Sequence, residues 1–127
     1  MSMSSYPATI VSLDDFVTIS SGLITTETTL NIYNQSLYSM NDASSQLFEP
    51  VRVMVANRLS TNGEEWTETV SRYNSGTYNN QWMVVDYNKV RDDGSLEDGA
   101  LWVYEQLPGR MLNVFFIDIL LILISFR

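Results

Sequence analysis

The loop at residues 74–81 gathers uncharged amide side chains beside an apolar run. Its sequence, NSGTYNNQ, holds three Asn and one Gln around a single Gly, and the apolar stretch WMVV follows directly at residues 82–85. Carboxamides donate and accept hydrogen bonds at neutral pH without carrying a charge. A polar, uncharged loop that leads into a buried strand is typical of a binding site or of a site that stabilises an oxyanion.

Two residues of this loop, Asn80 and Asn79, are candidate oxyanion donors. Acyl transfer needs N–H groups aimed at the oxyanion of the tetrahedral intermediate, and losing one such donor costs about 2.7–4 kcal/mol. Asn80 is the first choice and Asn79 the alternative. Neighbours on an extended backbone point in opposite directions, so only one of the two should face a pocket. The competing interpretation is that both amides satisfy hydrogen bonds within the turn.

The segment from residue 74 to residue 87, NSGTYNNQWMVVDY, resembles a signature segment of the phospholipase B-like family, also called the lamina-ancestor family. Other blocks agree with the family in the same order, and the resemblance covers residues 4–109. These blocks are Ser5–Thr9 with Asp14-Asp15-Phe16, Ser21–Thr29, Val55–Leu59 and Glu105–Gly109.

The resemblance implies an N-terminal nucleophile hydrolase fold, in which α-helices are layered around two antiparallel sheets. In that fold a self-cleaved precursor exposes an N-terminal Cys, whose thiol attacks an acyl carbon while its α-amino group acts as the base. This chain contains no Cys, so the nucleophile would lie before Met1. We therefore expect residues 1–109 to be a fragment of the hydrolase domain that is inactive alone.

The family also implies a pocket role for Thr29, because a Thr-rich strand end lies beside the nucleophile and Thr29 is the matching position. Its backbone N–H or its hydroxyl would serve, although Thr29 can equally be an ordinary strand residue. The implied function is hydrolysis of a lipid or amide acyl substrate, in a lysosome or outside the cell, with no cofactor. Nothing in the residues selects a phospholipid over an amide. The alternative is a non-catalytic truncated product, either a decoy or binding protein or a chain without a stable fold.

Composition narrows the function classes. The chain has 127 residues, enough for one domain, and 45% of them are hydrophobic. A net charge of −8 argues against binding to nucleic acid. The absence of Cys and His excludes disulfides, Cys/His zinc sites and Ser–His catalysis. A metal site made only of Asp and Glu stays open, but none is predicted.

Localisation is indicated in two conflicting ways. Residues 1–9, MSMSSYPAT, have neither the basic nor the apolar region of a signal peptide, whereas the family is lysosomal or secreted. Asn34 begins the sequon Asn34-Gln35-Ser36, a candidate for N-glycosylation. Its use depends on entry into the secretory pathway.

The periodicity predicts an α+β fold with antiparallel strands and a helix pair. The family resemblance implies that these elements are incomplete layers of the N-terminal nucleophile hydrolase fold. Residues 31–50 show no period and are expected on the surface. On the first helix Val51, Val55 and Leu59 share one face, and Asn62-Gly63 would end it. The strand at 82–87 is expected to be covered on both faces. The predicted elements are strands at 8–12, 16–20, 23–30, 82–87 and 100–106, and helices at 51–60 and 64–73.

Residues 110–127 form a divergent hydrophobic tail, nearly unbroken in apolar residues from Val114 to Phe126 apart from Asp118 and Ser125. Three interpretations stay open: a non-native ending, a buried core strand or a short membrane anchor. The run is shorter than the roughly 18–20 residues that cross a bilayer. A central Asp adds about 2.5–3.5 kcal/mol to insertion, so anchoring is the least favoured.

Overall fold

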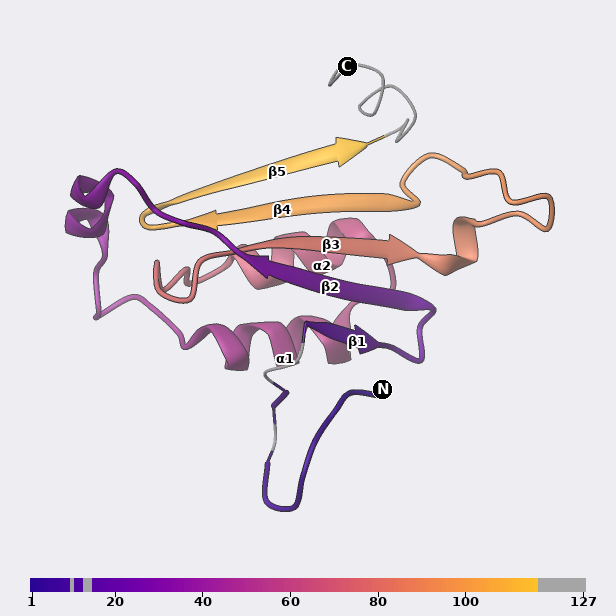
Figure 1. Ribbon diagram of the computed structural model, residues 1–127, viewed down its shortest axis with the longest axis horizontal. Helices are drawn as coiled ribbons and strands as arrows, with labels where there is room; N and C mark the ends of the chain where they lie inside the picture. The colour runs from indigo at the N-terminus through magenta and orange to yellow at the C-terminus, as the bar shows by residue number, and fades with distance from the viewer. Residues whose placement is uncertain (10, 13–14, 117–127) are drawn as a thin grey trace.

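One antiparallel sheet organises the chain, as Figure 1 shows. The computed structural model describes residues 1–9, 11–12 and 15–116. The strands follow one another across the sheet in chain order, β1-β2-β3-β4-β5. Together with the helices they confirm the predicted α+β class. The strands are β1 (Phe16–Thr18), β2 (Leu23–Thr29), β3 (Asn80–Asp86), β4 (Leu101–Leu107) and β5 (Arg110–Phe116).

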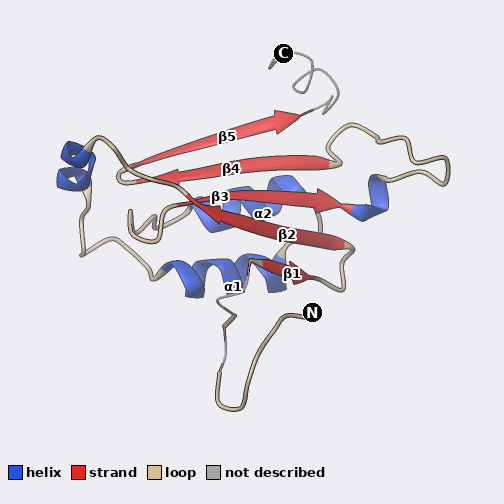
Figure 2. Cartoon of the chain, in the orientation of Figure 1, coloured by secondary structure: helices blue, strands red, loops and turns tan. Residues whose placement is uncertain are grey.

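Two α-helices pack on one face of this sheet, behind it in the view of Figure 2. They are α1 (Glu49–Leu59) and α2 (Gly63–Ser71), and short 3₁₀ helices η1 (Gln35–Met40) and η2 (Tyr87–Lys89) lie in the connections. The core between the layers is centred on Trp66 and Trp82, whose ring centroids are 5.4 Å apart. The other buried members of this core are Val17, Ile19, Leu23, Val53, Ala56, Val70, Val84 and Tyr104.

Strand β3 lies at the centre of the sheet, between β2 and β4. Its residues alternate between buried and half-buried from Asn80 to Asp86. Among the described residues, the prediction that this strand is covered on both faces therefore holds for one face only, and the other face is half-covered. Met83 and Val85 complete the apolar run, but they face away from the helices and are only half-buried.

Helix α1 presents to the core a face that the apolar pattern did not indicate. Val51, Val55 and Leu59 do share one face, but they are 46%, 42% and 70% exposed. The buried side carries Arg52 and Ala56 instead. The charged side chain can be buried because its donors find oxygen partners, which periodicity alone cannot reveal.

The connection between the helices is built differently from the prediction. Asn62 does not end the first helix; its side-chain oxygen accepts a hydrogen bond from Glu65 N at 2.9 Å and so begins α2. The Glu65 carboxylate in turn accepts from the backbone N–H of Thr61, the residue before the cap, at 2.9 Å. Position 63 requires Gly, because a Cβ there would lie 2.2 Å from the Trp102 ring.

The first predicted strand, residues 8–12, does not form among the described residues of that range. Residues 7–8 make a turn, and Ala8 has φ of 69°, which is incompatible with a strand. Ile10 lies outside the described residues. The predicted strand at 16–20 is present but ends at Thr18, since the chain turns at Ile19, whose carbonyl accepts from Gly22 N at 3.0 Å.

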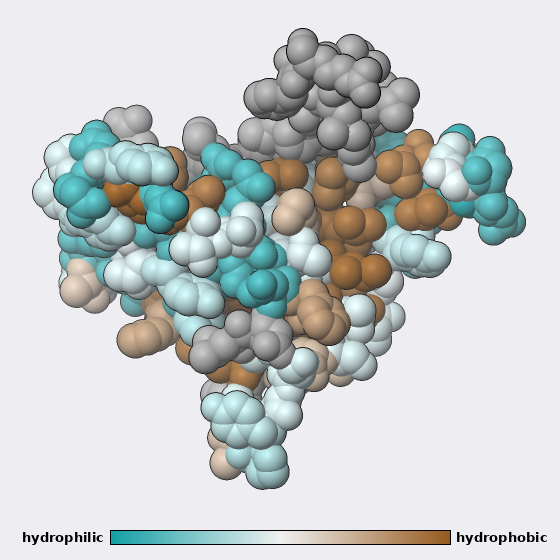
Figure 3. Space-filling view, in the orientation of Figure 1, coloured by the Kyte–Doolittle hydropathy of each residue, from teal (hydrophilic) through white to brown (hydrophobic). Residues whose placement is uncertain are grey.

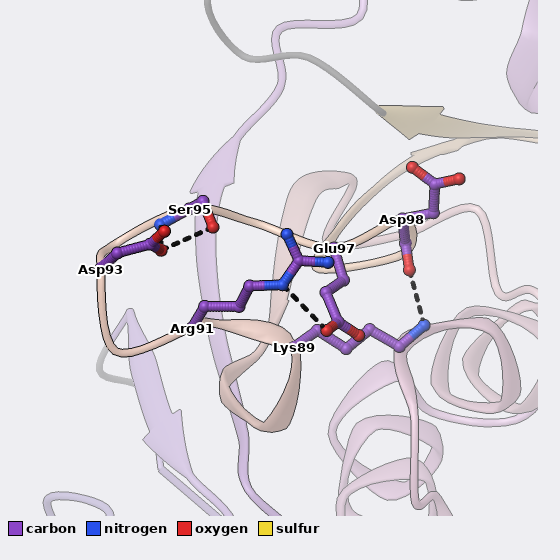
Figure 4. Close-up of polar contacts among 6 residues, drawn as sticks. All are labelled: Lys89, Arg91, Asp93, Ser95, Glu97 and Asp98. Carbon is purple, nitrogen blue, oxygen red and sulfur yellow. Dashed lines mark hydrogen bonds and ion pairs between the residues drawn. The ribbon is translucent and has the colours of Figure 1, made fainter.

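A long hairpin loop joins β3 to β4 and projects from the sheet, with its polar contacts drawn in Figure 4. Arg91 and Glu97 form an ion pair at 3.2 Å. The Asp93 carboxylate accepts from Ser95 Oγ at 2.6 Å, and Lys89 Nζ donates to the Asp98 carbonyl at 2.8 Å. These contacts close the loop on itself, and β3 and β4 pair antiparallel from Gln81↔Glu105 to Val85↔Leu101.

The first part of the tail continues the sheet. Residues 110–116 form β5, which pairs antiparallel with β4 from Leu107↔Arg110 to Leu101↔Phe116. Residues 117–127 lie outside the described residues, and the predicted boundary at residue 110 stays a prediction. Within the described residues, no helix combines the length and the apolar character needed to cross a bilayer.

Candidate functional site

The loop before β3 is held in a fixed shape by its own amide side chains. Asn74 accepts from Gly76 N at 3.0 Å and donates to the Leu107 carbonyl at 2.8 Å. Gly76 has φ of 62°, a conformation that favours glycine. The loop is thereby tied both to itself and to the end of β4.

Asn80 is the first residue of β3 and lies directly opposite Thr29, the last residue of β2. Asn80 is fully buried, and neither atom of its side-chain amide has a hydrogen-bond partner among the described residues. Directly opposed residues of an antiparallel pair share one face of the sheet. The structure therefore brings together Asn80 and Thr29, two residues that are far apart in the sequence.

Asn79 is also buried but is used differently. Its side chain donates to the Gly76 carbonyl at 2.9 Å, and its backbone carbonyl accepts from Leu30 N at 2.9 Å. Its side-chain oxygen has no partner within the described part of the chain. Asn79 thus closes the turn, as the competing interpretation of the loop amides expects, whereas Asn80 makes no such contact. Thr29 is exposed at the strand end.

A buried arginine, which sequence reasoning missed, connects α1 to this loop. Arg52 is 3% exposed, and its guanidinium donates to Gln106 Oε1 at 2.5 Å, to the Leu47 carbonyl at 3.2 Å and to the Val70 carbonyl. Gln106 in turn donates to the Thr77 carbonyl at 2.9 Å. The only indication in the sequence is that a charged residue interrupts the apolar pair of valines at 51 and 53.

Two buried carboxyl groups lie near the same end of the sheet and were also missed. Burial raises the pKa of Glu49 to about 7; the Arg52 guanidinium opposes this rise and the Glu27 carboxyl adds to it. Burial, with Asp15 nearby, raises the pKa of Glu27 as well. Burial next to these acids raises the pKa of the Tyr78 phenol. Glu27 lies opposite Trp82, and these two residues form the inward-facing pair next to the pair of Thr29 and Asn80.

Two further predictions concern metal and carbohydrate. Across the described residues, no group of three or more acidic side chains is arranged to hold a metal ion. Asn34 is exposed at the start of η1, and its side-chain oxygen accepts from Ser36 Oγ at 2.7 Å. The sequon is therefore on the surface.

Comparison with known proteins identifies relatives of this chain. A family model described as "Phospholipase B" matches residues 1–117, so the match continues beyond Gly109 through β5. Phospholipase B-like protein B of Dictyostelium discoideum is 51% identical over 106 residues, which cover 84% of this chain and 18% of the relative. Phospholipase B-like 1 of Bos taurus is 46% identical over 108 residues, covering 85% of this chain and 20% of the relative.

Phospholipase B of Crotalus adamanteus is 47% identical over 107 residues, which cover 84% of this chain and 19% of the relative. The chain thus spans about a fifth of the length of the curated relatives it matches. The family model, which matches nearly the whole chain, agrees with the resemblance carried by the loop at 74–81 and its neighbouring blocks. The chain belongs to the phospholipase B family.

Proposed function

We propose that this chain supplies one wall of the acyl-transfer site of a phospholipase B-like hydrolase, with Asn80 as the oxyanion donor and Thr29 beside it. One observation carries the proposal: the Asn80 amide is fully buried without a hydrogen-bond partner among the described residues. An unsatisfied buried polar group costs about 1–3 kcal/mol, and a role in binding or catalysis is one reason for a protein to keep it.

The reaction uses this amide when the acyl carbonyl is attacked. The nucleophile implied by the family is an N-terminal Cys, and these 127 residues contain no Cys, so the thiol comes from another segment. Attack places a negative charge on the carbonyl oxygen, and the Asn80 N–H stabilises that charge without a proton transfer. The α-amino group of that Cys takes the thiol proton and gives it to the leaving group, so collapse of the intermediate releases an alcohol or an amine. Water then hydrolyses the thioester to the free acid and restores the thiol.

The substrate is proposed as the acyl ester of a phospholipid or a fatty-acid amide, because both pass through the same oxyanion. Asn80 is fully buried in this structure, so the acyl oxygen reaches it only after a movement that opens the loop at 74–79 or the end of β2.

The sheet is proposed as one of the two central sheets of an N-terminal nucleophile hydrolase fold. Its helices cover one face, and the other face carries half-buried apolar side chains, visible as the brown area over the sheet in Figure 3. A second sheet would cover these residues. They include Ile24, Met83, Val85, Leu101 and Val103.

A chimera tests the function. Residues 1–109 replace the aligned segment of Dictyostelium phospholipase B-like protein B, and hydrolysis of a phospholipid ester and of a fatty-acid amide is assayed. We expect turnover from the chimera and none from the isolated chain, since only the chimera contains a thiol nucleophile. The control is the chimera with the relative's nucleophilic cysteine replaced by Ala. A folded but inactive chimera, or turnover by the pure isolated chain, contradicts the proposal.

Location in a lysosome or outside the cell is proposed together with glycosylation at Asn34, the only Asn-X-Ser/Thr sequon of the chain. Expressed behind a secretory signal peptide, the chain is expected to lose mass on treatment with an N-glycosidase, because the sequon is exposed. Asn34→Gln removes the shift, whereas Asn88→Gln, outside any sequon, keeps it. A secreted wild-type chain with unchanged mobility contradicts the modification.

A further inference from the structure

A small cavity of about 30 Å³ lies between the start of α1 and the inward faces of β2 and β3. Its polar lining comes from Ser12 in the N-terminal segment and from the side chains of Glu27, Glu49, Asn57, Tyr78 and Trp82. Neither Thr29 nor Asn80 lines it, so it is separate from the proposed acyl site. A cavity needs about 10–15 Å³ to hold one water molecule, so this one has room for a water and is too small for a lipid.

Two of the residues that line this cavity carry a buried N–H donor without a partner among the described residues. Trp82 is 6% exposed, and its Nε1 has no acceptor among the described residues. The Asn57 side chain has a fixed orientation, because its oxygen accepts from Trp66 Nε1 at 2.7 Å. Its Nδ2 is left buried and, within the described residues, without an acceptor. Buried donors of this kind are nearly always paired with protein or with ordered water.

Two carboxyl groups supply the acceptors. Glu27 is 8% exposed and its Oε2 has no partner among the described residues, and Glu49 is 4% exposed. Burial raises the pKa of both carboxyl groups. The other ionisable groups that face the pair are Asp15 beside Glu27, Arg52 on α1 and the Tyr78 phenol.

The combination of donors and acceptors selects the ligand. A metal ion would find no lone pair on the two N–H groups, and an anion, which only accepts hydrogen bonds, would leave the acceptor oxygens of the two carboxyl groups unpaired. A water molecule donates two hydrogen bonds and accepts two, so it matches both pairs. We propose that the cavity binds one water molecule, which accepts hydrogen bonds from Trp82 Nε1 and Asn57 Nδ2 and donates to the carboxyl groups of Glu27 and Glu49.

This water joins α1 to the central strands, because Asn57 and Glu49 belong to the helix while Glu27 and Trp82 are directly opposed on β2 and β3. It lies one inward-facing pair along the strands from Thr29 and Asn80. Its assignment does not depend on the proposed acyl hydrolysis, since it rests on hydrogen-bond satisfaction alone.

Water-selective NMR on the ¹⁵N-labelled chain tests the site. The chain has three Trp, so the indole N–H region is simple, and Trp82→Phe assigns the signal. We expect cross-relaxation between the Trp82 indole proton and a long-lived water. The Trp66 indole, which donates to Asn57, is the internal comparison and should show a weaker effect. A folded wild-type chain whose Trp82 indole shows no long-lived water overturns the proposal.

Two variants of one residue separate the water from general effects on the fold. Glu27→Gln keeps an acceptor oxygen, so the cross-peak is expected to persist. Glu27→Leu removes the acceptor and fills the space, so the cross-peak is expected to disappear. Loss of the cross-peak in folded Glu27→Gln, or its persistence in folded Glu27→Leu, contradicts the assignment.

A crystal structure provides an independent measurement that needs no variant. Density for one water at about 3 Å from Trp82 Nε1 and from a carboxyl oxygen supports the site. A Trp82 Nε1 bonded directly to a protein acceptor overturns it.

Discussion

Replacing Asn80 with Ala in the chimera is expected to lower kcat for acyl hydrolysis by about 10²- to 10³-fold, the usual effect of losing one oxyanion donor. The physical reason is that the amide acts only when charge develops on the carbonyl oxygen. KM should therefore change little, because the ground-state carbonyl demands less from the donor. Steady-state kinetics on a phospholipid ester and on a fatty-acid amide measure both constants.

Two further variants make this result specific. Asn80→Asp preserves size but exchanges the N–H donor for an oxygen, so it should be no more active than Asn80→Ala. Gln81→Ala is the matched control, because Gln81 is the next amide on the strand, points to the other face and contacts Glu105 at 2.6 Å. Wild-type kcat in folded Asn80→Ala chimera would remove Asn80 from the site.

Replacing Arg52 with Met is expected to destabilise the chain by about 3 kcal/mol, because it leaves buried acceptors unsatisfied at roughly 1–3 kcal/mol each. Three acceptors lose the hydrogen bond that Arg52 donates to them: Gln106 Oε1, the Val70 carbonyl and the Leu47 carbonyl. These three partners are uncharged acceptors, and the substitution removes only their donor. Urea unfolding measures the difference in the free energy of unfolding.

Arg58→Met is the matched control, since Arg58 lies on the exposed side of the same helix. Exposed substitutions away from special contacts usually change stability by about 0.5 kcal/mol or less. Equal effects of the two substitutions would show that the contacts of Arg52 contribute no more than an exposed charge does. Arg52→Lys should recover part of the loss, because an ammonium reaches fewer of the acceptors than a guanidinium.

The loop and its neighbour could be predicted from the sequence because both are local features. The amide-rich loop at 74–81 precedes an apolar run, and the Thr-rich stretch before residue 30 favours a strand. The two segments lie side by side because of the register between β2 and β3, which places Thr29 opposite Asn80. The family resemblance, and not periodicity, is what linked the two in advance.

The polar core could not be predicted because burial depends on partners from distant segments. Arg52 and Gln106 are 54 residues apart, and neither would be expected inside without the other. Glu27 and Glu49 likewise become neighbours only when α1 packs on β2. For the same reason the apolar stripe of Val51, Val55 and Leu59 showed that a helix was present but not which side is buried.

The order of the strands determines at which border a further strand can pair over the greater length. Among the described strands, β1 forms one border with three residues and β5 forms the other with seven. Thr18 of β1 already exchanges backbone hydrogen bonds with Ser2 at 2.7 Å and 2.9 Å. A border strand offers its free N–H and C=O groups as a template for another strand. An added strand, from this protein or from a second copy, therefore finds the longer template at β5.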